Sequence, residues 1–349
     1  MTRVAVVGVG SMGKNHARVY QDLSDVDLVA VVDQDETTAM NASRKFHVPA
    51  YTDISEMIER KKPEAVSVAV PTQHHFVVVK QLLEAGCHVL VEKPIAANLA
   101  ESQDLVTTAK RLGRILMVGH IERFNPAVVE LKRRLEAGEL GRVFQIHTRR
   151  LGPFPSRIQD VGVVMDLATH DLDIMRYLTG SEVIRVYSEI KRELHTSQED
   201  LFAGILRFED GTIGILEINW LTPTKIRELY VTGERGMYRV NYITQDLCFF
   251  ENAESNGSNW STLSLLRGVS EGMMIQYAIH KQEPLRAELE SFISCVKGNC
   301  LHLANGHDAQ AALQLAQALV DSAQRGSVKK VSQNVYSQPR TREQIARAS

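Results

Sequence analysis

The feature that most constrains how this chain can fold is a glycine triplet near its N-terminus. An apolar run, residues 4–7, leads directly into Gly8-Val9-Gly10-Ser11-Met12-Gly13. A G-x-G-x-x-G that follows a strand and opens a helix is the fingerprint of a dinucleotide-binding βαβ unit. The first glycine allows a tight turn, the second lets the backbone approach a pyrophosphate, and the third permits close packing of helix on strand. The alternative is a glycine turn that binds nothing.

An acidic residue follows the triplet at the distance that a dinucleotide site requires. Asp33 stands 20 residues beyond Gly13, at the end of a second apolar run. A carboxylate there takes the ribose hydroxyls and repels the 2′-phosphate of NADP. Since no Arg or Lys follows before Arg44, the sequence favours NAD. The N–H groups of Ser11 and Met12, at the start of the predicted helix, would bind the pyrophosphate.

The first 120 residues alternate short apolar runs with amphipathic segments. Unbroken runs rich in Val, Ile and Leu suit strands that are buried on both faces of a parallel sheet. Strand and helix in alternation predict a doubly wound α/β Rossmann domain. The expected strands are 4–7, 28–32, 65–70, 88–91 and 115–118, and the expected helices are 11–24, 35–46, 73–85 and 99–112.

The pattern changes after Gly119, where a helix over 124–137 precedes a series of strand-like segments. Such a series is typical of an α+β domain with an open, mostly antiparallel sheet, here with a helix over 164–178 laid on it. The expected strands lie near 142–150, 182–191, 201–208, 213–220, 225–232 and 236–242, followed by helices at 285–298 and 307–324. The predicted domains are a Rossmann domain 1–121, an α+β domain 122–331 and a polar tail 332–349.

Composition excludes several classes of protein. With 349 residues and 44% hydrophobic residues, the chain can bury a sizeable core and is not a disordered protein. Forty basic and 42 acidic residues give a net charge of −2, without the basic footprint of a nucleic-acid binder. No stretch approaches the ~20 apolar residues of a membrane span, and the N-terminal run is too short for a signal peptide. We therefore expect a soluble, cytoplasmic protein.

The cysteines indicate neither a metal site nor a disulfide framework. Cys87, Cys248, Cys295 and Cys300 include no pair at CxxC spacing, the spacing of zinc and redox sites. Four thiols in a chain of this length also do not make a disulfide framework. We expect no bound metal and no disulfide framework.

A candidate proton-transfer group follows the predicted strand 88–91. Glu92-Lys93-Pro94 stands at the carboxyl end of the parallel sheet, where ligands of such folds bind. Burial beside a cationic cofactor ring could lower the pKa of Lys93 and suit it to proton transfer. The alternative is a solvated surface lysine.

A second candidate lies in the predicted helix 164–178. Asp166 and His170 are four residues apart and therefore share a helix face. A histidine can move a proton near neutral pH, and a neighbouring carboxylate can orient it. The alternatives are an ordinary acidic helix start or part of a zinc site, although no further Cys or His stands at a suitable spacing.

Three segments, 120–126, 149–158 and 219–227, are rich in basic and amide side chains. Arginine guanidinium groups suit phosphate oxygens, and prolines hold such loops rigid. We predict that these segments bind an anionic substrate, with scattered surface arginines as the alternative. The candidate residues are Arg123, Asn125, Arg150, Arg157, Asn219, Lys225 and Arg227.

Taken together, the motifs resemble the Gfo/Idh/MocA family of sugar and inositol dehydrogenases. The resemblance rests on the glycine triplet, Pro71-Thr72-Gln73-His74-His75, the stretch 85–94 that ends in Glu92-Lys93-Pro94, and Asp166 to His170, and it covers most of residues 1–325. It implies that Lys93 and His170 handle the substrate hydroxyl proton, with Asp166 beside them, while the nicotinamide takes the hydride. It also implies that Pro71, Thr72, His75 and Glu92 belong to the cofactor site.

The basic segments are similar to those of one branch of this family. That branch oxidises the C3 hydroxyl of UDP-N-acetylglucosamine and supplies an aminotransferase, in lipid A or surface-polysaccharide synthesis. The alternatives are the uronic-acid relative of this sugar nucleotide, a free sugar or inositol, and a non-enzymatic NAD-binding sensor. Because an open sheet face needs covering, we also expect a homodimer or homotetramer.

Overall fold

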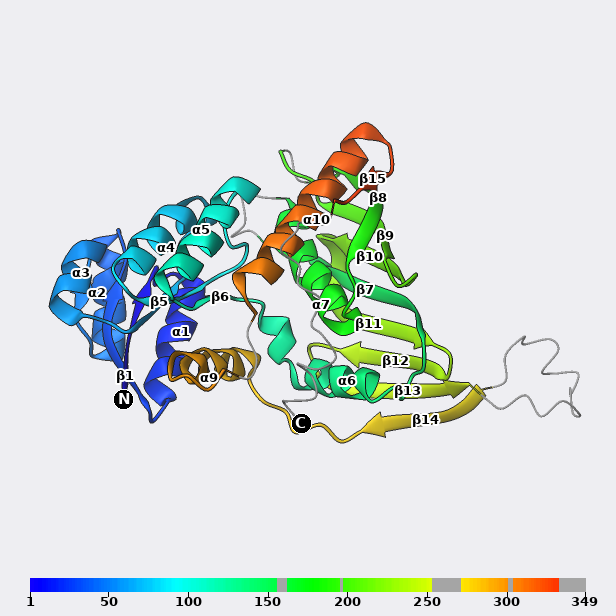
Figure 1. Cartoon of the computed structure of the whole chain (residues 1–349), viewed down its shortest axis with the longest axis horizontal. Helices are drawn as coiled ribbons and strands as arrows, with labels where there is room; N and C mark the ends of the chain where they lie inside the picture. The colour runs from blue at the N-terminus through cyan, green and yellow to red at the C-terminus, as the bar shows by residue number, and fades with distance from the viewer. Residues whose placement is uncertain (156–161, 195–196, 253–270, 301–303, 333–349) are drawn as a thin grey trace, which may run out of the picture. The chain divides into compact units, whose positions relative to one another are not determined.

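The computed structural model describes residues 1–155, 162–194, 197–252, 271–300 and 304–332 (Figure 1). The chain divides into two compact units. Among these residues the first unit comprises Met1–Phe124 and Glu283–Gln314, and the second comprises Asn125–Gln282 and the segment from Leu315. The predicted substrate residue Arg157 and the predicted tail from residue 333 onward lie outside the described residues.

The first unit contains a six-stranded parallel sheet in the order β3-β2-β1-β4-β5-β6. All five predicted apolar runs form strands of this sheet, which confirms the doubly wound fold. Only β3 was not predicted, because two half-exposed residues give no periodicity. The order reverses between β1 and β4, and ligands of such sheets bind where it does so. The strands are β1 (Thr2–Val7), β2 (Val26–Val32), β3 (Ala50–Tyr51), β4 (Ala65–Val68), β5 (His88–Val91) and β6 (Leu116–Val118).

Helices separate these strands, and several begin at a side-chain cap. Asp35, Asp53 and Asn98 each accept the backbone N–H three residues further on, which satisfies a donor that the helix itself leaves unpaired. These helices are α1 (Ser11–Asp22), α2 (Glu36–Phe46), α3 (Ile54–Lys61), η1 (Thr72–His74), α4 (His75–Glu84), α5 (Leu99–Leu112) and η2 (Ile121–Phe124).

Helix α9 (Pro284–Val296) also belongs to the first unit, although the strands of the second unit precede it in the chain. Its residues Leu285, Leu289 and Phe292 are buried in the same core as Tyr20 of α1. The sequence pattern placed this helix in the domain 122–331. Periodicity shows that a helix has an apolar face but not which core that face joins.

The second unit is built on a nine-stranded sheet in the order β14-β13-β12-β11-β7-β10-β9-β8-β15. Only β7 and β10 pair in parallel, so the predicted open, mostly antiparallel sheet is confirmed. Its strands are β7 (Val143–Pro153), β8 (Val183–Lys191), β9 (Leu201–Phe208), β10 (Ile213–Asn219), β11 (Leu221–Gly233), β12 (Gly236–Asn241), β13 (Asp246–Asn252), β14 (Glu271–Tyr277) and β15 (Lys329–Lys330).

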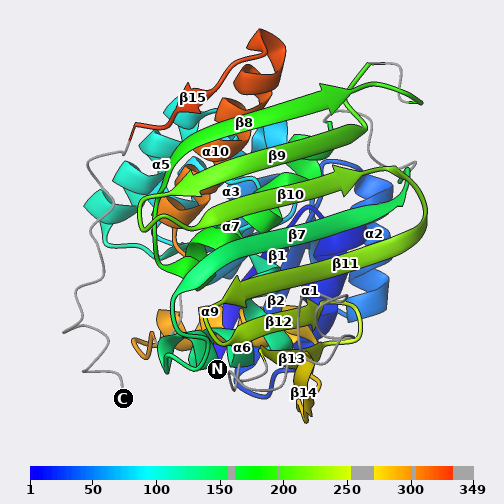
Figure 2. The same ribbon diagram turned by 90° about the vertical axis from the view of Figure 1, so that its right-hand side faces the viewer.

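Helices cover one face of this sheet. They are α6 (Pro126–Glu136), the π-helical turn η3 (Val164–Ala168), α7 (Thr169–Thr179) and the C-terminal half of α10 (Gly306–Arg325). Leu172 and Met175 of α7 are buried in the same core as Leu216 and Leu229 of the sheet. The opposite face is turned toward the viewer in Figure 2, and no helix of the described ranges lies on it.

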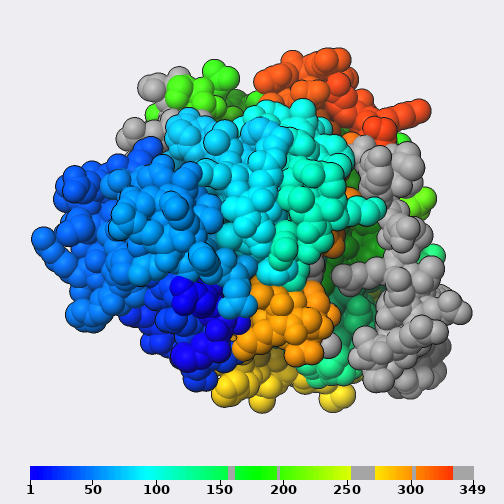
Figure 3. Space-filling model, turned by 60° about the vertical axis from the view of Figure 1, so that its left-hand side comes forward, coloured from blue at the N-terminus to red at the C-terminus, as the bar shows by residue number. Residues whose placement is uncertain are grey.

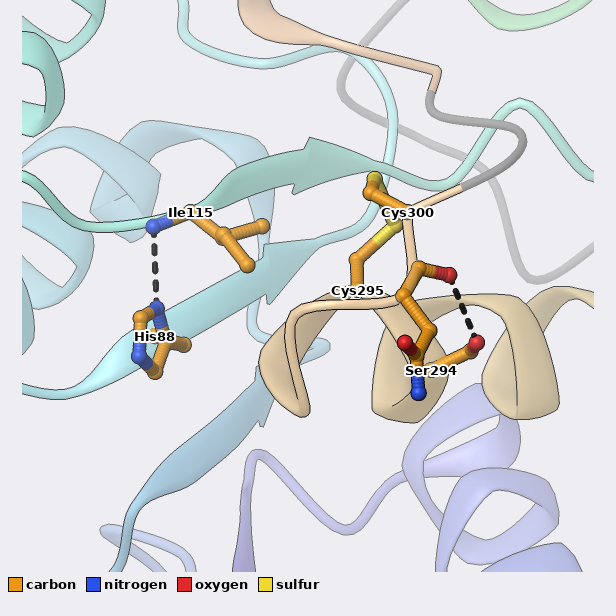
Figure 4. Close-up of a disulfide and its surroundings, with 6 residues drawn as sticks. His88, Ile115, Ser294, Cys295 and Cys300 are labelled. Carbon is orange, nitrogen blue, oxygen red and sulfur yellow. Dashed lines mark hydrogen bonds between the residues drawn. A yellow bond between two sulfur atoms is a disulfide. The ribbon is translucent and has the colours of Figure 1, made fainter. Parts of the chain in front are cut away.

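The sequence analysis excluded a disulfide framework but did not foresee the local disulfide that the structure contains. Cys295, near the end of α9, is bonded to Cys300 (Figure 4). The chain turns back between them at Gly298, which has a φ of +88°, and the Ser294 hydroxyl donates to the Asn299 carbonyl at 2.8 Å. This local turn, which spacing alone does not reveal, brings the two sulfur atoms together.

No helix in the described part of the chain is long and apolar enough to cross a lipid bilayer.

Candidate active site

The glycine triplet forms the tight connection between β1 and α1. Gly8 has a φ of +82°, and a Cβ atom there would lie 2.7 Å from the carbonyl carbon of Ala69. A Cβ on Gly13 would lie 1.8 Å from the carbonyl oxygen of Gly8, so only glycine permits this approach. At Gly10, in contrast, no atom lies within 4 Å of the position that a Cβ would take. The loop is therefore closely packed against the protein at Gly8 and Gly13 and open at Gly10.

The start of α1 and the Asp33 carboxylate supply polar groups to this loop. The N–H groups of Ser11 and Met12 open the helix and have no acceptor within it, which leaves them for an anion. The Asp33 carboxylate follows β2, accepts the N–H groups of Val9 at 2.9 Å and Asp35 at 3.1 Å, and remains partly exposed. These groups and the open second glycine fit the pyrophosphate and ribose of a dinucleotide.

A buried histidine joins the loop after β4 to the loop after β5. Pro71 precedes η1 (Thr72–His74), and His75 begins α4. The His75 ring places Nδ1 2.7 Å from the carbonyl oxygen of Pro94 and Nε2 2.9 Å from that of Val70. Burial lowers the pKa of His75, although the two carbonyl oxygens act in the opposite sense. A neutral ring can donate to only one of these two oxygens at a time.

The Glu92 carboxylate anchors the turn that carries Lys93. Glu92-Lys93-Pro94 follows β5, with a cis bond between Lys93 and Pro94. Glu92 Oε1 lies 3.0 Å from Nε2 of His16, which is completely buried, and Oε2 accepts the Lys93 N–H at 3.3 Å. Burial acts to raise the pKa of Glu92, but its contact with His16 and the charge of Lys93 outweigh it and leave that pKa below its usual value. Glu92 is thus an anion held from two sides.

Asp166 and His170 lie on consecutive helical turns of the second unit. Asp166 belongs to the π-helical turn η3, and His170 lies in the first turn of α7. Glu199 holds the start of η3, because its carbonyl oxygen accepts the Val163 N–H at 2.9 Å and its carboxylate the Val164 N–H at 3.3 Å. The sequence predicted a regular helix over 164–178, whereas the structure begins with a wide turn of the kind that is frequent at functional sites.

A buried ion pair fastens the helix of His170 to the sheet. The Arg150 guanidinium of β7 donates to both oxygens of Asp171, with Nε–Oδ2 at 2.9 Å and Nη2–Oδ1 at 3.0 Å. Their side chains are only 5% and 1% exposed.

Among the residues that the structure describes, no group of three His, Cys, Asp or Glu side chains is arranged to hold a metal ion.

Two family models match the chain. The model described as "Oxidoreductase family, NAD-binding Rossmann fold" matches residues 2–120, and the "GFO/IDH/MocA C-terminal domain" matches residues 128–239. The chain belongs to the Gfo/Idh/MocA oxidoreductase family. Its first unit is an NAD-binding Rossmann domain, and the resemblance drawn from the motifs is confirmed.

Members of the family with assigned reactions match this chain over most of their length. The UDP-N-acetylglucosamine 3-dehydrogenase of Acidithiobacillus ferrooxidans is 27% identical, over 93% of this chain and 99% of that protein. The myo-inositol 2-dehydrogenase of Thermotoga maritima is 26% identical, over 90% and 94%. A solved structure of the former enzyme has a TM-score of 0.80 at 25% identity, over 93% and 98%. The WlbA dehydrogenase of Bordetella pertussis, in complex with NADH and UDP-GlcNAcA, has a TM-score of 0.80 at 22% identity over 95% and 98%, and it supports the fold alone.

In this Gfo/Idh/MocA protein, two of the arginines predicted to bind substrate already hold carboxylates of their own unit. Arg123 is buried, and its Nη1 lies 2.9 Å from Oδ2 of Asp308. Arg150 is the partner of Asp171 in the buried ion pair. Both guanidinium groups leave little surface for a ligand, so their predicted role in substrate binding receives no support from the geometry.

The other predicted substrate residues differ in what they contact. Asn125 caps α6 and donates to the Tyr242 carbonyl at 3.0 Å, and Asn219 Oδ1 accepts two N–H groups at the start of β11. Lys225 is exposed on β11, with no ion pair to any described residue, and Arg227 is half-buried nearby on the same strand. Lys225 and Arg227 are thus two residues apart on one strand, and they are the predicted substrate cations that do not pair with a buried carboxylate of their own unit among the contacts described above.

The sequence analysis missed the residues that support the candidate groups. His16 behind Glu92, Glu199 before Asp166, and Asp171 beside His170 all act from buried positions. Their common signal is an ionisable residue at a position where the pattern demands an apolar one. Lys93 belongs to the first unit, and Asp166 and His170 belong to the second.

Proposed function

We propose that this protein oxidises the C3 hydroxyl of UDP-N-acetylglucosamine to the 3-keto sugar nucleotide, with NAD as the acceptor. The family and its assigned members make the chain an oxidoreductase of the sugar and inositol dehydrogenase type. The observation that carries the substrate is the similarity to a UDP-N-acetylglucosamine 3-dehydrogenase over 93% of this chain and 99% of that enzyme. Essentially the whole of that relative has a counterpart here.

The residues of the chain provide for the proton and for the position of the sugar. NAD, when bound, supplies the acceptor for the hydride of the oxidised carbon. We propose that the His170 imidazole, oriented by Asp166, accepts the hydroxyl proton. The Lys93 ammonium is the second group that carries a proton in the site. The Arg150–Asp171 pair fixes α7, because a donor fork on both carboxylate oxygens leaves it one orientation.

In this proposal, Lys225 and Arg227 bind the substrate diphosphate. Both cations lie on β11, two residues apart, and Lys225 is exposed. Arg227 also donates to the Ile226 carbonyl at 2.8 Å, which restrains its guanidinium near the strand. A neutral monosaccharide would leave the Lys225 charge without an anionic partner.

A second candidate is oxidation of a free inositol or sugar. It is favoured by the myo-inositol 2-dehydrogenase of Thermotoga maritima, which is nearly as similar as the sugar-nucleotide enzyme. The uronic-acid relative of the substrate would need an additional cation for its C6 carboxylate. A non-enzymatic NAD sensor would have no use for Lys93, Asp166 and His170.

The chemistry of the product suggests the class of the next reaction. Oxidation of a secondary alcohol by NAD is unfavourable at neutral pH, so little ketone accumulates unless another enzyme removes it. We propose that an aminotransferase consumes the 3-keto sugar in the cytoplasm and forms a 3-amino sugar nucleotide.

The open face of the nine-stranded sheet suggests the oligomeric state. Ile205 on this face is 53% exposed, and the strands around β7 form a hollow of about 460 Å³. We infer that a second copy of the chain covers it in a homodimer or homotetramer, which light scattering would detect. The hollow is lined by Gln145, His147, Arg149, Glu217, Tyr230, Thr232 and Met237.

The test is a coupled assay with NAD, a panel of UDP-sugars, free hexoses and myo-inositol, with and without a 3-keto-sugar aminotransferase. We expect turnover of UDP-N-acetylglucosamine that rises when the aminotransferase is present, with a 3-amino sugar nucleotide as product. Equal or faster conversion of a free hexose or inositol would overturn the substrate. Binding of NAD with no turnover of any substrate would favour the sensor.

A further inference from the structure

Two completely buried polar groups of the first unit have no hydrogen-bond partner among its described residues. One is Nδ1 of His16 on α1, and the other is the carboxyl group of Glu288 on α9, with both of its oxygens unpartnered. The outer surface of α9 is visible in orange in Figure 3, whereas the Glu288 side chain is 0% exposed. Buried polar groups are almost always hydrogen-bonded, so both groups call for an explanation.

The two groups face the same buried region. His16 and Tyr20 lie one turn apart on one face of α1, and the Tyr20 hydroxyl is 2.7 Å from the hydroxyl oxygen of Ser67. The charge of Glu288 acts on Tyr20, and the charge of Glu92 acts on Glu288. His16 itself is hydrogen-bonded to Glu92. Helices α1 and α9 also pack against each other, with His16 and Glu288 among their buried residues.

The contact with Glu92 determines what Nδ1 of His16 needs. An ionised carboxylate only accepts hydrogen bonds, so Nε2 of His16 must carry the hydrogen that points to Glu92. Nδ1 of a neutral ring is then a lone pair that requires a donor. The His16 ring is completely buried, and burial disfavours an imidazolium, so we take the ring as neutral.

Glu288 is suited to be that donor. Burial, and then the charge of Glu92, raise the pKa of the Glu288 carboxyl well above its usual value, so it keeps its proton at neutral pH. Besides α1, the element η2 packs on α9 and brings Glu122 and Arg123, and Arg123 is paired with Asp308. A protonated carboxyl offers one O–H donor, which is the group that Nδ1 lacks.

We propose that Glu288 is a positioning residue for Lys93. Its O–H donates to Nδ1 of His16 through one buried water, and His16 donates from Nε2 to Glu92. Glu92 in turn accepts the backbone N–H of Lys93, so the buried chain of contacts ends at the turn that carries the proposed proton carrier. The kinetic consequence rests on the proposed function, whereas the protonation states do not.

The first test reads the His16 ring without any substrate. In protein with ¹⁵N-labelled histidine, the His16 signals are identified by their loss in His16→Gln. We expect wild type and Glu288→Gln, whose amide also donates, to show a neutral ring with hydrogen on Nε2 and a hydrogen-bonded Nδ1. Glu288→Leu should lose the bond at Nδ1, and Glu290→Gln, on the same helix but at the surface, should change nothing. A His16 imidazolium, or an unaltered ring in Glu288→Leu, would overturn the proposal.

The second test reads the Glu288 proton through stability. Because the folded-state pKa is raised, wild type loses stability as the pH rises from the unfolded value of 4.5 toward the folded value. Glu288→Gln removes this loss, so its Tm should exceed that of wild type by about 2–4 °C at pH 8 and match it near pH 4.5. Glu290→Gln should show no such trend. A difference that does not vary with pH would contradict a neutral Glu288.

The third test measures turnover. Glu288→Leu should lower kcat about tenfold with little change in either KM, because a displaced Lys93 affects the reaction and not binding. Glu288→Gln should stay within about twofold of wild type, since it keeps the donor. Full turnover in Glu288→Leu would refute the positioning role. An inactive wild type would instead refute the proposed function, while the ring and stability tests would still decide the state of Glu288.

Discussion

Arg149 and Arg150 are neighbours on β7, yet their guanidinium groups lie on opposite faces of the sheet. Arg149 pairs with Glu217 at 2.8 Å on the open face, where both side chains are partly exposed. Arg150 is buried and binds Asp171 of α7 with two hydrogen bonds. The alternation of side chains along a strand thus separates a surface pair from the buried pair that holds the helix of His170.

The buried pair should be far more costly to break than the surface pair. Arg150→Met or Asp171→Asn leaves a buried charge uncompensated and should lower the free energy of unfolding by about 3–5 kcal/mol. Arg149→Met, the matched control, should cost at most about 1 kcal/mol. Urea unfolding followed by circular dichroism measures both. Similar losses at the two positions would contradict the assignment of Arg150 to the core.

Alanine substitutions at Gly10 and Gly13 should affect different properties, cofactor binding in the first case and stability in the second. A Cβ on Gly10 meets open space, so Gly10→Ala should keep its stability within about 0.5 kcal/mol of wild type, while the methyl group hinders the pyrophosphate. Gly13→Ala places a Cβ 1.8 Å from the Gly8 carbonyl oxygen and should destabilise the first unit. Calorimetric titration with NAD and thermal unfolding separate the two outcomes. A Gly10→Ala protein that binds NAD normally would place the cofactor elsewhere.

Asp33 should determine the preference for NAD. Its carboxylate is held beside the glycine loop by the Val9 N–H and would repel the 2′-phosphate of NADP. We expect tighter binding of NAD than NADP, and a smaller difference in Asp33→Ala, which loses the ribose contact and the repulsion together. Binding titrations with both cofactors check this. Equal affinities in wild type would disprove it.

Lys93 and His170 should serve the proton and not substrate affinity. Lys93→Met and His170→Asn should each lower kcat by about 10²–10⁴-fold, the range of general acid–base catalysis, with folding and NAD binding intact. Lys80→Met, a surface lysine paired with Asp104, is the control and should keep full turnover. Near-normal kcat in both active-site variants would remove them from the mechanism.

Lys225 should act on binding alone. Lys225→Ala should raise KM for the UDP-sugar roughly 10- to 100-fold at unchanged kcat, because a phosphate contact remote from the reacting carbon stabilises ground and transition states alike. Lys191→Ala, on β8, is the control. Steady-state kinetics on both variants gives the answer, and an unchanged KM in Lys225→Ala would leave the diphosphate without this anchor.

Local chemistry made much of the first unit predictable. The glycines, Asp33 and the valine-rich strands have positions that backbone geometry and burial impose on the sequence nearby. Six strands of the second unit could also be placed, whereas β13, β14 and β15 were not predicted. In β13, for example, Leu247, Cys248 and Phe249 are buried in succession, so the strand lacks the alternation that would reveal it. Asp166 and His170 were predicted on one regular helix. The structure instead places Asp166 in a π-helical turn, whose start is held by Glu199, a residue distant in the sequence.

The sequence by itself determined the family, the parallel and antiparallel sheets and the candidate groups Lys93, Asp166 and His170, because these depend on patterns within a few turns or strands. Tertiary structure alone decided which ionisable side chains pair with one another. Arg150 pairs with Asp171, Arg123 pairs with Asp308, and His16 is hydrogen-bonded to Glu92. In each case many residues separate the two partners in the sequence. An ionisable side chain in a sequence does not reveal its partner, since burial and the approach of distant segments select it. That selection leaves Lys225 exposed and places Glu288 inside the first unit.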